Sequence, residues 1–289
     1  MDVVGKRLWF VGLSVAVILV GIAYLGARGL NLGIDFTSGT ALVVEFAEDP
    51  GIEQVRSVLY GARYSEAEVS REAGGGYYVR VRDLGVDAQE VMRGVLEPVF
   101  GTFDVDFTIP ETTTIGRSVA ENAVQNAVWA VVVASMLVML YIMYAFRAVP
   151  RSYRYAAAAI IALLHDVIIV LGAFAVLGDV ISAEVNAIFI VGILTVIGYS
   201  VNDTIVVFDR IRENSIRAPD RALRTTVNLS VTETVGRSLA TAITTVVVIL
   251  AMLLFGGPTL RDFLLVLLIG IVVGTYSSIF VAAQVLVAW

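Results

Sequence analysis

The stretch VIGYSVNDTIVVF, residues 196–208, places one carboxylic acid inside an otherwise apolar run. The acid is Asp203, and residues 204–208 separate it from the charged run that starts at Asp209. That separation corresponds to roughly 7 Å of helix. An ionisable group at the centre of a membrane helix costs roughly 2.5–3.5 kcal/mol and usually faces a partner or a water-filled path. Asp203 is therefore the first candidate functional residue, with placement at the membrane interface as the alternative.

The composition indicates an integral membrane protein. Of 289 residues, 58% are hydrophobic and only 16% are charged, which leaves too little polar surface to cover a soluble core. Apolar runs long enough to cross about 30 Å of hydrocarbon predict six membrane helices. They cover residues 8–25, 127–146, 155–177, 185–208, 239–255 and 263–288. An even number of spans places both termini on one side of the membrane.

Charges in the short loops predict the orientation, because Lys and Arg prefer the cytoplasmic side. Cations precede the first span and also join spans two to three and four to five, the last through a predicted cytoplasmic loop at 209–238. The turn between spans three and four carries Asp179 and Glu184 without a cation. We therefore expect a multi-pass protein of the cytoplasmic membrane with both termini in the cytoplasm. The first apolar run exceeds the roughly 7–15 residues of a signal-peptide core, which predicts an uncleaved anchor.

Residues 28–126 are expected to form an external soluble domain, between a first membrane helix at 1–27 and a five-helix membrane domain at 127–289. This segment contains 8 Arg against 16 Asp and Glu. It therefore lacks the basic face that nucleic acid or anionic lipid would require.

Apolar alternation in this segment predicts strands at 40–46, 66–71, 77–82 and 102–108, and helical spacing recurs at 52–59 and 91–99. The triplet Gly74, Gly75 and Gly76 is expected to form the hairpin turn between the middle strands. The resulting order β-α-β-β-α-β is that of a ferredoxin-like sandwich. The predicted fold class is thus an α-helical membrane protein with one external α+β ferredoxin-like domain between helices one and two.

Several classes of chemistry lack the residues that they need. The chain has no cysteine and a single histidine, His165, which excludes disulfides, thiolate nucleophiles and sites with several imidazole ligands. No G-x-S-x-G or G-x-x-x-x-G-K-[ST] pattern occurs. We therefore expect no enzyme activity, no metal and no cofactor.

Polar residues recur at helical spacing in the fourth and fifth spans. One face of the fourth span is expected to carry Thr195, Tyr199 and Asp203, with Asn202 beside them. The fifth span carries a corresponding series of polar residues: Arg237, Thr241, Thr244 and Thr245. Antiparallel packing would bring Asp203 close to Arg237, although an arginine at a helix end also commonly reaches to the interface.

An Asp203–Arg237 pair would form a switch, because burial favours the neutral acid and a nearby cation favours the charged form. Movement between these environments would load and release a proton. Each elementary charge that crosses the membrane yields about 2.3 kcal/mol per 100 mV, which can bias a two-state element. The external domain is the module expected to move.

Two further polar groups lie in the third and sixth spans. His165 and Asp166 come about 10 residues after the start of the third span, at roughly 15 Å depth. They are a candidate relay, with a hydrogen-bonded helix contact as the alternative. In the sixth span, a face of small residues predicts close helix packing, and it consists of Gly270, Gly274, Ser277 and Ser278.

Four motifs together resemble the SecD/SecF family of protein-export membrane subunits, and within it SecF. They are GIDFTSGT at 33–40, LLHDV at 163–167, GYSVNDTIVVFDRIREN at 198–214 and GTYSSIF at 274–280. The first contains the external-loop residues Asp35, Thr37 and Gly39. The family is similar to the resistance-nodulation-division superfamily of proton-driven transporters.

The resemblance implies that Asp203 and Arg237 are the proton-coupling acid and its basic partner. It also implies a SecD-type subunit, the SecYEG channel and unfolded preprotein as partners in the lipid bilayer, with the proton gradient driving a late step of export. Two positions depart from the family pattern, since Ser38 replaces a usual Gly and Gln284 replaces a frequent Pro. The chain would then be half of a transporter, either a separate SecF or part of a fused SecDF.

Three other functions are consistent with parts of the sequence. Asp166 and Asp203 could form an intramembrane aspartyl protease, but the G-x-G-D pattern is absent. A proton-driven small-molecule exporter of the same superfamily would keep the polar stripe, although such exporters normally carry more spans and a doubled outer domain. A non-coupling structural subunit of the translocon would keep its function after Asp203→Asn.

Overall fold

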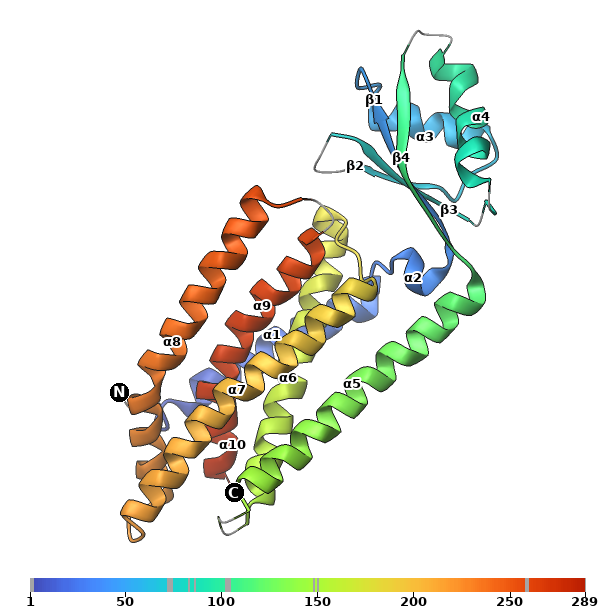
Figure 1. The fold of residues 1–289 in the computed structure, drawn as a ribbon. Helices are drawn as coiled ribbons and strands as arrows, with labels where there is room; N and C mark the ends of the chain where they lie inside the picture. Colours follow the sequence, from blue (N-terminus) through green and yellow to red (C-terminus); the bar gives the residue numbers. More distant parts are fainter. Residues whose placement is uncertain are drawn as a thin grey trace. The chain divides into compact units, whose positions relative to one another are not determined.

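The computed structural model describes residues 3–71, 75–82, 84–85, 87–101, 105–147, 149, 151–257 and 260–288. The chain forms two compact units. One is an α+β unit at Leu32–Ala127, and the other is a helical unit that combines Met1–Asn31 with Val128–Trp289 (Figure 1).

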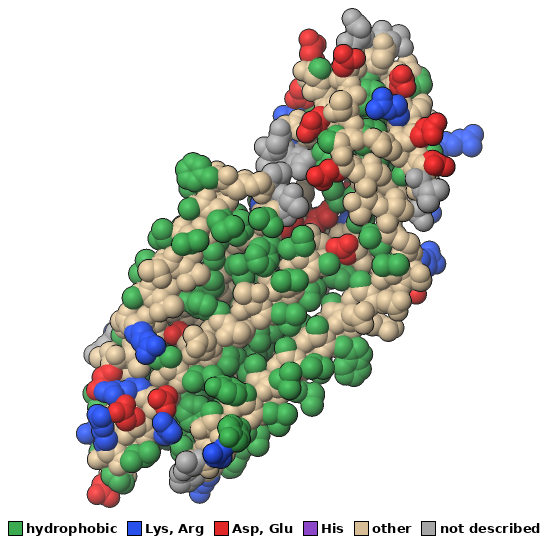
Figure 2. Space-filling model, viewed as in Figure 1, with side chains coloured by type: hydrophobic (Ala, Val, Ile, Leu, Met, Phe, Trp, Pro, Cys, Tyr) green, Lys and Arg blue, Asp and Glu red, His purple; other side chains and the backbone are tan. Residues whose placement is uncertain are grey.

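The prediction of six membrane helices is confirmed, since six helices of the described chain are long and apolar enough to cross a membrane. They are α1 (Arg7–Arg28), α5 (Arg117–Ala145), α6 (Tyr153–Ile181), α7 (Ala187–Arg217), α8 (Leu223–Phe255) and the continuous run of α9 (Arg261–Ser277), η3 (Ser278–Ala282) and α10 (Ala283–Ala288). Hydrophobic side chains cover much of the visible surface of these helices (Figure 2). Exposed apolar area of this extent suits a lipid environment.

The predicted loop at 209–238 is wrong, because most of it is helical. α7 continues to Arg217 and α8 already starts at Leu223. Arg210 and Glu233 form an ion pair at 2.6 Å across the two helical extensions. Figure 2 shows charged side chains of both signs gathered at this end of the α7–α8 hairpin. Hydropathy marks only the length of helix in contact with lipid, whereas a helix continues in water where charged pairs and backbone hydrogen bonds support it.

Glycines allow α9 to approach α7 closely. A Cβ atom on Gly270 would lie 2.1 Å from a methyl carbon of Val196, and one on Gly274 would lie 2.9 Å from the Cβ of Ser200. No larger residue fits at either position without a shift of the helices. The two glycines that were predicted to serve helix packing therefore lie directly against α7.

The predicted order β-α-β-β-α-β is confirmed in the α+β unit (Figure 1). The elements are β1 (Gly39–Phe46), α3 (Ile52–Gly61), β2 (Glu68–Arg71), β3 (Tyr77–Val81), α4 (Ala88–Phe100) and β4 (Phe107–Ile115). The sheet has the order β2-β3-β1-β4 with antiparallel neighbours, which is ferredoxin-like. Its core is formed by Leu42, Val44, Val55, Leu59, Tyr77, Val79, Met92, Leu96 and Phe100.

The fourth strand lies further along the chain than the predicted 102–108. β4 pairs with β1 from Phe46 opposite Phe107 to Gly39 opposite Ile115, and residues 102–104 lie outside the described residues. Pro110 counts against a strand in the sequence. β4 is last in the sheet order, however, and an edge strand tolerates a proline because one side makes no ladder hydrogen bonds.

Of the hairpin turn predicted at 74–76, Gly74 lies outside the described residues. Gly75 has a φ of 98°, a conformation that favours glycine.

Backbone conformation is unusual where α2 (Ile34–Thr37) leads into β1. Ser38 has a φ of 62° and a ψ of 165°, a region that is essentially restricted to glycine. Gly39 has a φ of 129°, and a Cβ atom there would lie 2.7 Å from the carbonyl oxygen of Val81. The backbone therefore requires glycine at 39, whereas the serine at 38 is strained.

Replacing Ser38 with Gly is expected to stabilise the α+β unit by about 1 kcal/mol, because relief of backbone strain exceeds the added flexibility of the unfolded chain. Hydrogen exchange of the β1 and β3 amides in the full chain measures this change. Gly39→Ala is the opposing variant and should reduce amide protection. Unchanged protection in Ser38→Gly would contradict the prediction.

A small polar cluster surrounds Asp49 ahead of α3. Its carboxylate accepts hydrogen bonds from the Tyr77 hydroxyl, from the Gly51 amide at 2.9 Å and from the Arg71 guanidinium at 2.5 Å. The hydrogen bond from Tyr77, followed by that from Gly51, holds the pKa of Asp49 below its ordinary value. The cluster therefore favours the ionised carboxylate.

This lowered pKa predicts a pH dependence of stability. The folded-state pKa of Asp49 lies below its unfolded value, so the carboxylate stabilises the α+β unit above the ordinary pKa of 3.8 and the contribution is lost as the pH falls through the folded-state pKa. Asp49→Asn should reduce the loss of thermal stability at low pH. The measurement is the unfolding temperature as a function of pH, followed by circular dichroism. Asp87→Asn is the control, since Asp87 is exposed and its side chain makes no capping hydrogen bond. A loss of stability at low pH that survives in Asp49→Asn would exclude this cluster as its source.

Candidate functional site

Asp203 lies on the side of α7 that contacts α8. Its Oδ1 accepts a hydrogen bond from the Ser238 hydroxyl at 2.5 Å. Its Oδ2 is buried and has no hydrogen-bond partner in the described part of the chain. A charged oxygen without a donor is costly in such a place, whereas a proton on Oδ2 removes the charge. The geometry therefore suits an acid that gains and loses a proton.

Arg237 is not the residue that contacts Asp203. Its side chain is exposed on α8, and the two residues form no ion pair among those that the structure describes. Ser238, the next residue along α8, is 2% exposed and makes the contact instead. Consecutive helical residues point roughly 100° apart, so only one of the two can face α7 in a given arrangement. The direct Asp203–Arg237 contact expected from the sequence is absent from this structure.

Of the threonine stripe predicted on the fifth span, Thr241 and Thr244 are exposed, whereas Thr245 is half-buried beside Tyr199. The hydroxyl of Thr241 donates to the Arg237 carbonyl at 3.0 Å, and that of Thr245 donates to the Thr241 carbonyl at 2.9 Å. Such bonds satisfy a hydroxyl within its own helix and leave it free to face lipid. The inward stripe of α8 consists of small hydroxyl residues that are all buried: Thr226, Ser230, Thr234 and Ser238. Their four-residue repeat is the sequence signal that identifies Ser238.

The stripe predicted on the fourth span is only partly buried. Thr195 and Asn202 are exposed, and the Thr195 hydroxyl donates to a carbonyl of its own helix at 2.8 Å. Tyr199 is half-buried beside an apolar cluster of α8 and α9. Tyr199 and Asp203 are therefore the two members of the stripe that turn toward other helices.

A second carboxylate, Asp166 of α6, is 1% exposed. Its Oδ2 accepts hydrogen bonds from Ser200 of α7 at 2.5 Å and from Ser277 of α9 at 2.8 Å. Its Oδ1 lies 2.9 Å from His165 Nδ1. These contacts tie α6, α7 and α9 together, which corresponds to the alternative expected for His165 and Asp166, a hydrogen-bonded helix contact. Ser200 was not identified from the sequence.

Ser278 adds a second link between α9 and α7. Its hydroxyl lies 2.8 Å from that of Thr204 and donates to the Ser200 carbonyl at 3.2 Å. Ser278 also begins η3, a π-helical turn of a kind often found at functional sites. Ser277 and Ser278, which were predicted to serve packing, therefore connect helices through hydrogen bonds as well as through their small size.

The external-loop motif belongs to the α+β unit. The Thr37 hydroxyl donates to the Gly33 carbonyl at 3.1 Å, Asp35 lies within α2 and Gly39 begins β1. Thr37 and Gly39 thus shape the turn into the sheet. In the parts of the chain that the structure describes, no three His, Cys, Asp or Glu side chains are grouped as metal ligands would be.

Comparisons with known proteins agree with these features. A family model described as "Protein export membrane protein SecD/SecF, C-terminal" matches residues 95–289, and one described as "SecD/SecF GG Motif" matches residues 23–49. A protein translocase subunit SecF from Thermobaculum terrenum is 41% identical over 302 residues, covering 100% of this chain and 94% of the relative. Its counterpart from Anaerolinea thermophila is 37% identical over 292 residues, with the same coverage.

Two crystal structures show the same fold. SecDF from Thermus thermophilus, described as a translocon-associated membrane protein, matches with a TM-score of 0.88 and 33% identity, covering 100% of this chain. SecDF in a super-membrane-facing form matches with a TM-score of 0.70 and 32% identity, again over 100% of this chain. The chain spans 38% of the length of each SecDF chain. The full-length match to curated relatives and the family model over residues 95–289 establish that this chain belongs to the SecF family of protein translocase subunits.

Proposed function

We propose that this translocase subunit uses the proton gradient to drive a late step of preprotein export, together with a SecD-type subunit. The observation that supports this most directly is the environment of Asp203. Ser238 binds one carboxyl oxygen, while the other is buried without a partner among the described residues. Such a carboxyl group holds a proton at low cost and needs a cation or water once the proton leaves.

The order of residues on α8 supports a two-state switch. In the present arrangement Ser238 donates to one carboxyl oxygen of Asp203, which leaves the other oxygen available for a proton. An ionised Asp203 is better paired with a cation, and Arg237 is adjacent to Ser238 on the helix. A local rotation of α8 at Ser238 by roughly 100° would exchange the two side chains. Each charge that crosses the membrane supplies about 2.3 kcal/mol per 100 mV to bias such an exchange.

The hydrogen bonds to Asp166 would hold the helices that do not move in this switch. They tie α6, α7 and α9 to one another. α8 is joined to α7 by the Arg210–Glu233 ion pair, so the proposed movement is confined to the segment of α8 around Ser238. We propose that Asp166 positions α7, and that the motion reaches the external α+β unit through α1 and α5, which flank it in the chain.

Location and partners follow from the charges and from the family. The Lys and Arg residues in the short loops support cytoplasmic termini and an external α+β unit in the cytoplasmic membrane. The SecDF structures contain a chain of which this protein spans 38%, which supports a SecD-type subunit as the missing half. The SecYEG channel and unfolded preprotein complete the proposed assembly. The proposed role is transport, with no enzyme reaction.

Asp203→Asn should reduce gradient-stimulated export to the level measured without a gradient. The amide still accepts the hydrogen bond from Ser238 but does not exchange a proton in the physiological range. The measurement is translocation of a preprotein into vesicles that contain the assembled complex, with and without a proton gradient. Arg237→Ala should show the same loss, because an ionised Asp203 then lacks its cation.

The matched control is Asp209→Asn, which removes an acid from the same helix at an exposed position. It should leave gradient-stimulated export unchanged, and co-purification with the SecD-type subunit should be normal in all three variants. Normal stimulation in Asp203→Asn would instead identify a structural subunit that does not couple protons.

Ser277→Ala should destabilise the helical unit by about 1 kcal/mol, because it removes one donor from the buried Asp166 carboxylate. Unfolding of the purified chain in a detergent titration, followed by circular dichroism, measures the loss. Ser135→Ala is the control, since the Ser135 hydroxyl donates to the Val131 carbonyl of its own helix, at 2.8 Å, and makes no other hydrogen bond among the described residues. Equal stability of the two variants would show that the Asp166 contacts do not hold the helices together.

A further inference from the structure

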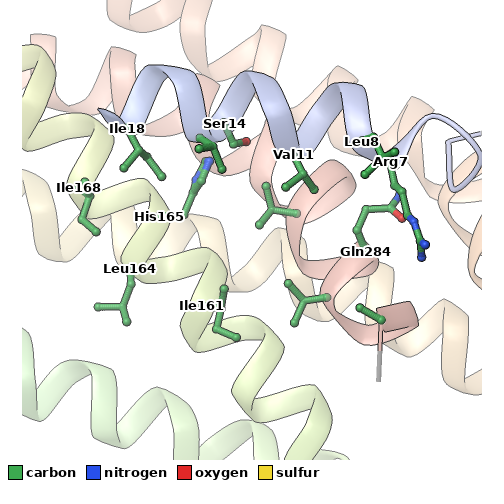
Figure 3. Close-up of a pocket in the computed structure, with 14 residues that line it drawn as sticks. Arg7, Leu8, Val11, Ser14, Ile18, Ile161, Leu164, His165, Ile168 and Gln284 are labelled. Carbon is green, nitrogen blue, oxygen red and sulfur yellow. The ribbon is translucent and has the colours of Figure 1, made fainter. Parts of the chain in front are cut away.

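A pocket of about 680 Å³ lies between α1, α6 and the η3–α10 segment (Figure 3). Most of its lining is aliphatic and comes from α1 and α6: Val11, Val15, Ile18, Ile161, Leu164 and Ile168. Beyond these residues the two helices meet, since a Cβ atom on Gly172 would lie 2.7 Å from the Cα of Gly21. The helices therefore separate toward the N-terminal end of α1 and leave an apolar groove between them.

Polar groups are found at the open end of this groove. Figure 3 shows Arg7 and Gln284 close together at one end, with Ser14, Ile18 and His165 at the other. Arg7 is exposed and forms no ion pair within the described chain. Gln284 is 3% exposed, and its Nε2 donates to the Val3 carbonyl at 3.4 Å. Its Oε1 is buried without a partner among the described residues.

The far end of the groove is closed by His165. Its ring stacks on Tyr276 with the centroids 6.3 Å apart, and Nδ1 lies beside Asp166. With the proton on Nδ1, Nε2 presents only a lone pair to the groove. Nε2 is buried and has no hydrogen-bond partner in the described part of the chain.

The length of the groove corresponds to one leaflet of a bilayer. Arg7 and Ile18 are separated by about 16 Å along α1, at 1.5 Å per residue, and half of the hydrocarbon core is about 15 Å. A chain that enters beside Arg7 would thus reach the middle of the membrane at His165. The groove combines a cation and a buried acceptor at the interface with an aliphatic channel below them.

We propose that this groove binds phosphatidylglycerol from the leaflet on the N-terminal side of α1. The phosphate would pair with Arg7, a glycerol hydroxyl would donate to Gln284 Oε1, and one acyl chain would lie between α1 and α6. Phosphatidylcholine and phosphatidylethanolamine each carry a cationic ammonium that Arg7 would repel, whereas phosphatidylglycerol is a net anion. The inference does not depend on the proposed proton coupling.

The test is native mass spectrometry of the full chain in detergent with dioleoyl phosphatidylglycerol, phosphatidylethanolamine or phosphatidylcholine. Phosphatidylglycerol should bind about fivefold more tightly than the other two, the preference expected from one arginine near an anionic head group. Arg7→Gln should abolish this preference, and Gln284→Met should reduce it. Arg28→Gln, at the opposite end of α1, should leave it unchanged.

Two tryptophan variants test the channel itself. Val15→Trp fills the groove and should abolish specific binding of all three lipids. Val20→Trp is the matched control, because Val20 is 66% exposed on α1 and does not line the pocket. A phosphatidylglycerol with a photoreactive group at the end of an acyl chain should label peptides that contain residues 14–18 or 161–168.

Three results would overturn the proposal: equal binding of the three lipids, retained binding in Val15→Trp, or labelling elsewhere in the chain. Release of the bound lipid when the SecD-type subunit is added would also overturn it, because the groove would then be the docking site of a partner helix.

Discussion

The buried carboxylate of Asp166 accepts hydrogen bonds from hydroxyl groups on two other helices of the membrane unit. Hydrocarbon offers no donors, so a buried carboxylate must find them within the protein. Ser200 and Ser277 supply them, and Ser200 can approach because Gly274 leaves room for it, as a Cβ atom there would lie 2.9 Å away. The close packing at Gly274 is therefore what allows Ser200 to reach Asp166 and form its hydrogen bond. The position of α7, and with it that of Asp203, depends on this contact.

α7 carries two sets of polar groups with different properties. Ser200 and Thr204 face neighbouring helices, and each hydroxyl makes a hydrogen bond there, to Asp166 and to Ser278 respectively. About 60° around the helix from Ser200, three residues later in the chain, Asp203 has one oxygen bound by Ser238 of α8 and the other without a partner among the described residues. A satisfied contact resists change, whereas an unsatisfied oxygen responds to a proton or a cation. The same helix thus carries one face whose polar groups are paired and another whose carboxyl oxygen is free to bind a proton or a cation.

The places where sequence analysis failed have physical causes. The fourth strand was placed at 102–108, yet β4 runs on past Pro110. A proline is tolerated there because β4 is an edge strand, which is known only once the strand order β2-β3-β1-β4 is known. The polar residues at 209–238 were assigned to a loop, yet α7 and α8 continue through most of them. Hydropathy indicates whether a segment lies in lipid or in water. It does not indicate the residue at which the helical hydrogen bonds end. The ion pair between Arg210 and Glu233 that joins the two extensions links residues far apart in the chain.

The sequence by itself determined the six membrane helices, the order of elements in the external unit and the position of one acid, Asp203, within an apolar run. These are local properties, because apolar length, alternation and an acid in an apolar run can be recognised within a short window. Only the tertiary structure decided which neighbours these residues meet. Arg237 and Ser238 are adjacent in sequence, but they point roughly 100° apart on α8. The rotation of that helix against α7, which no local pattern specifies, selects Ser238 as the partner of Asp203.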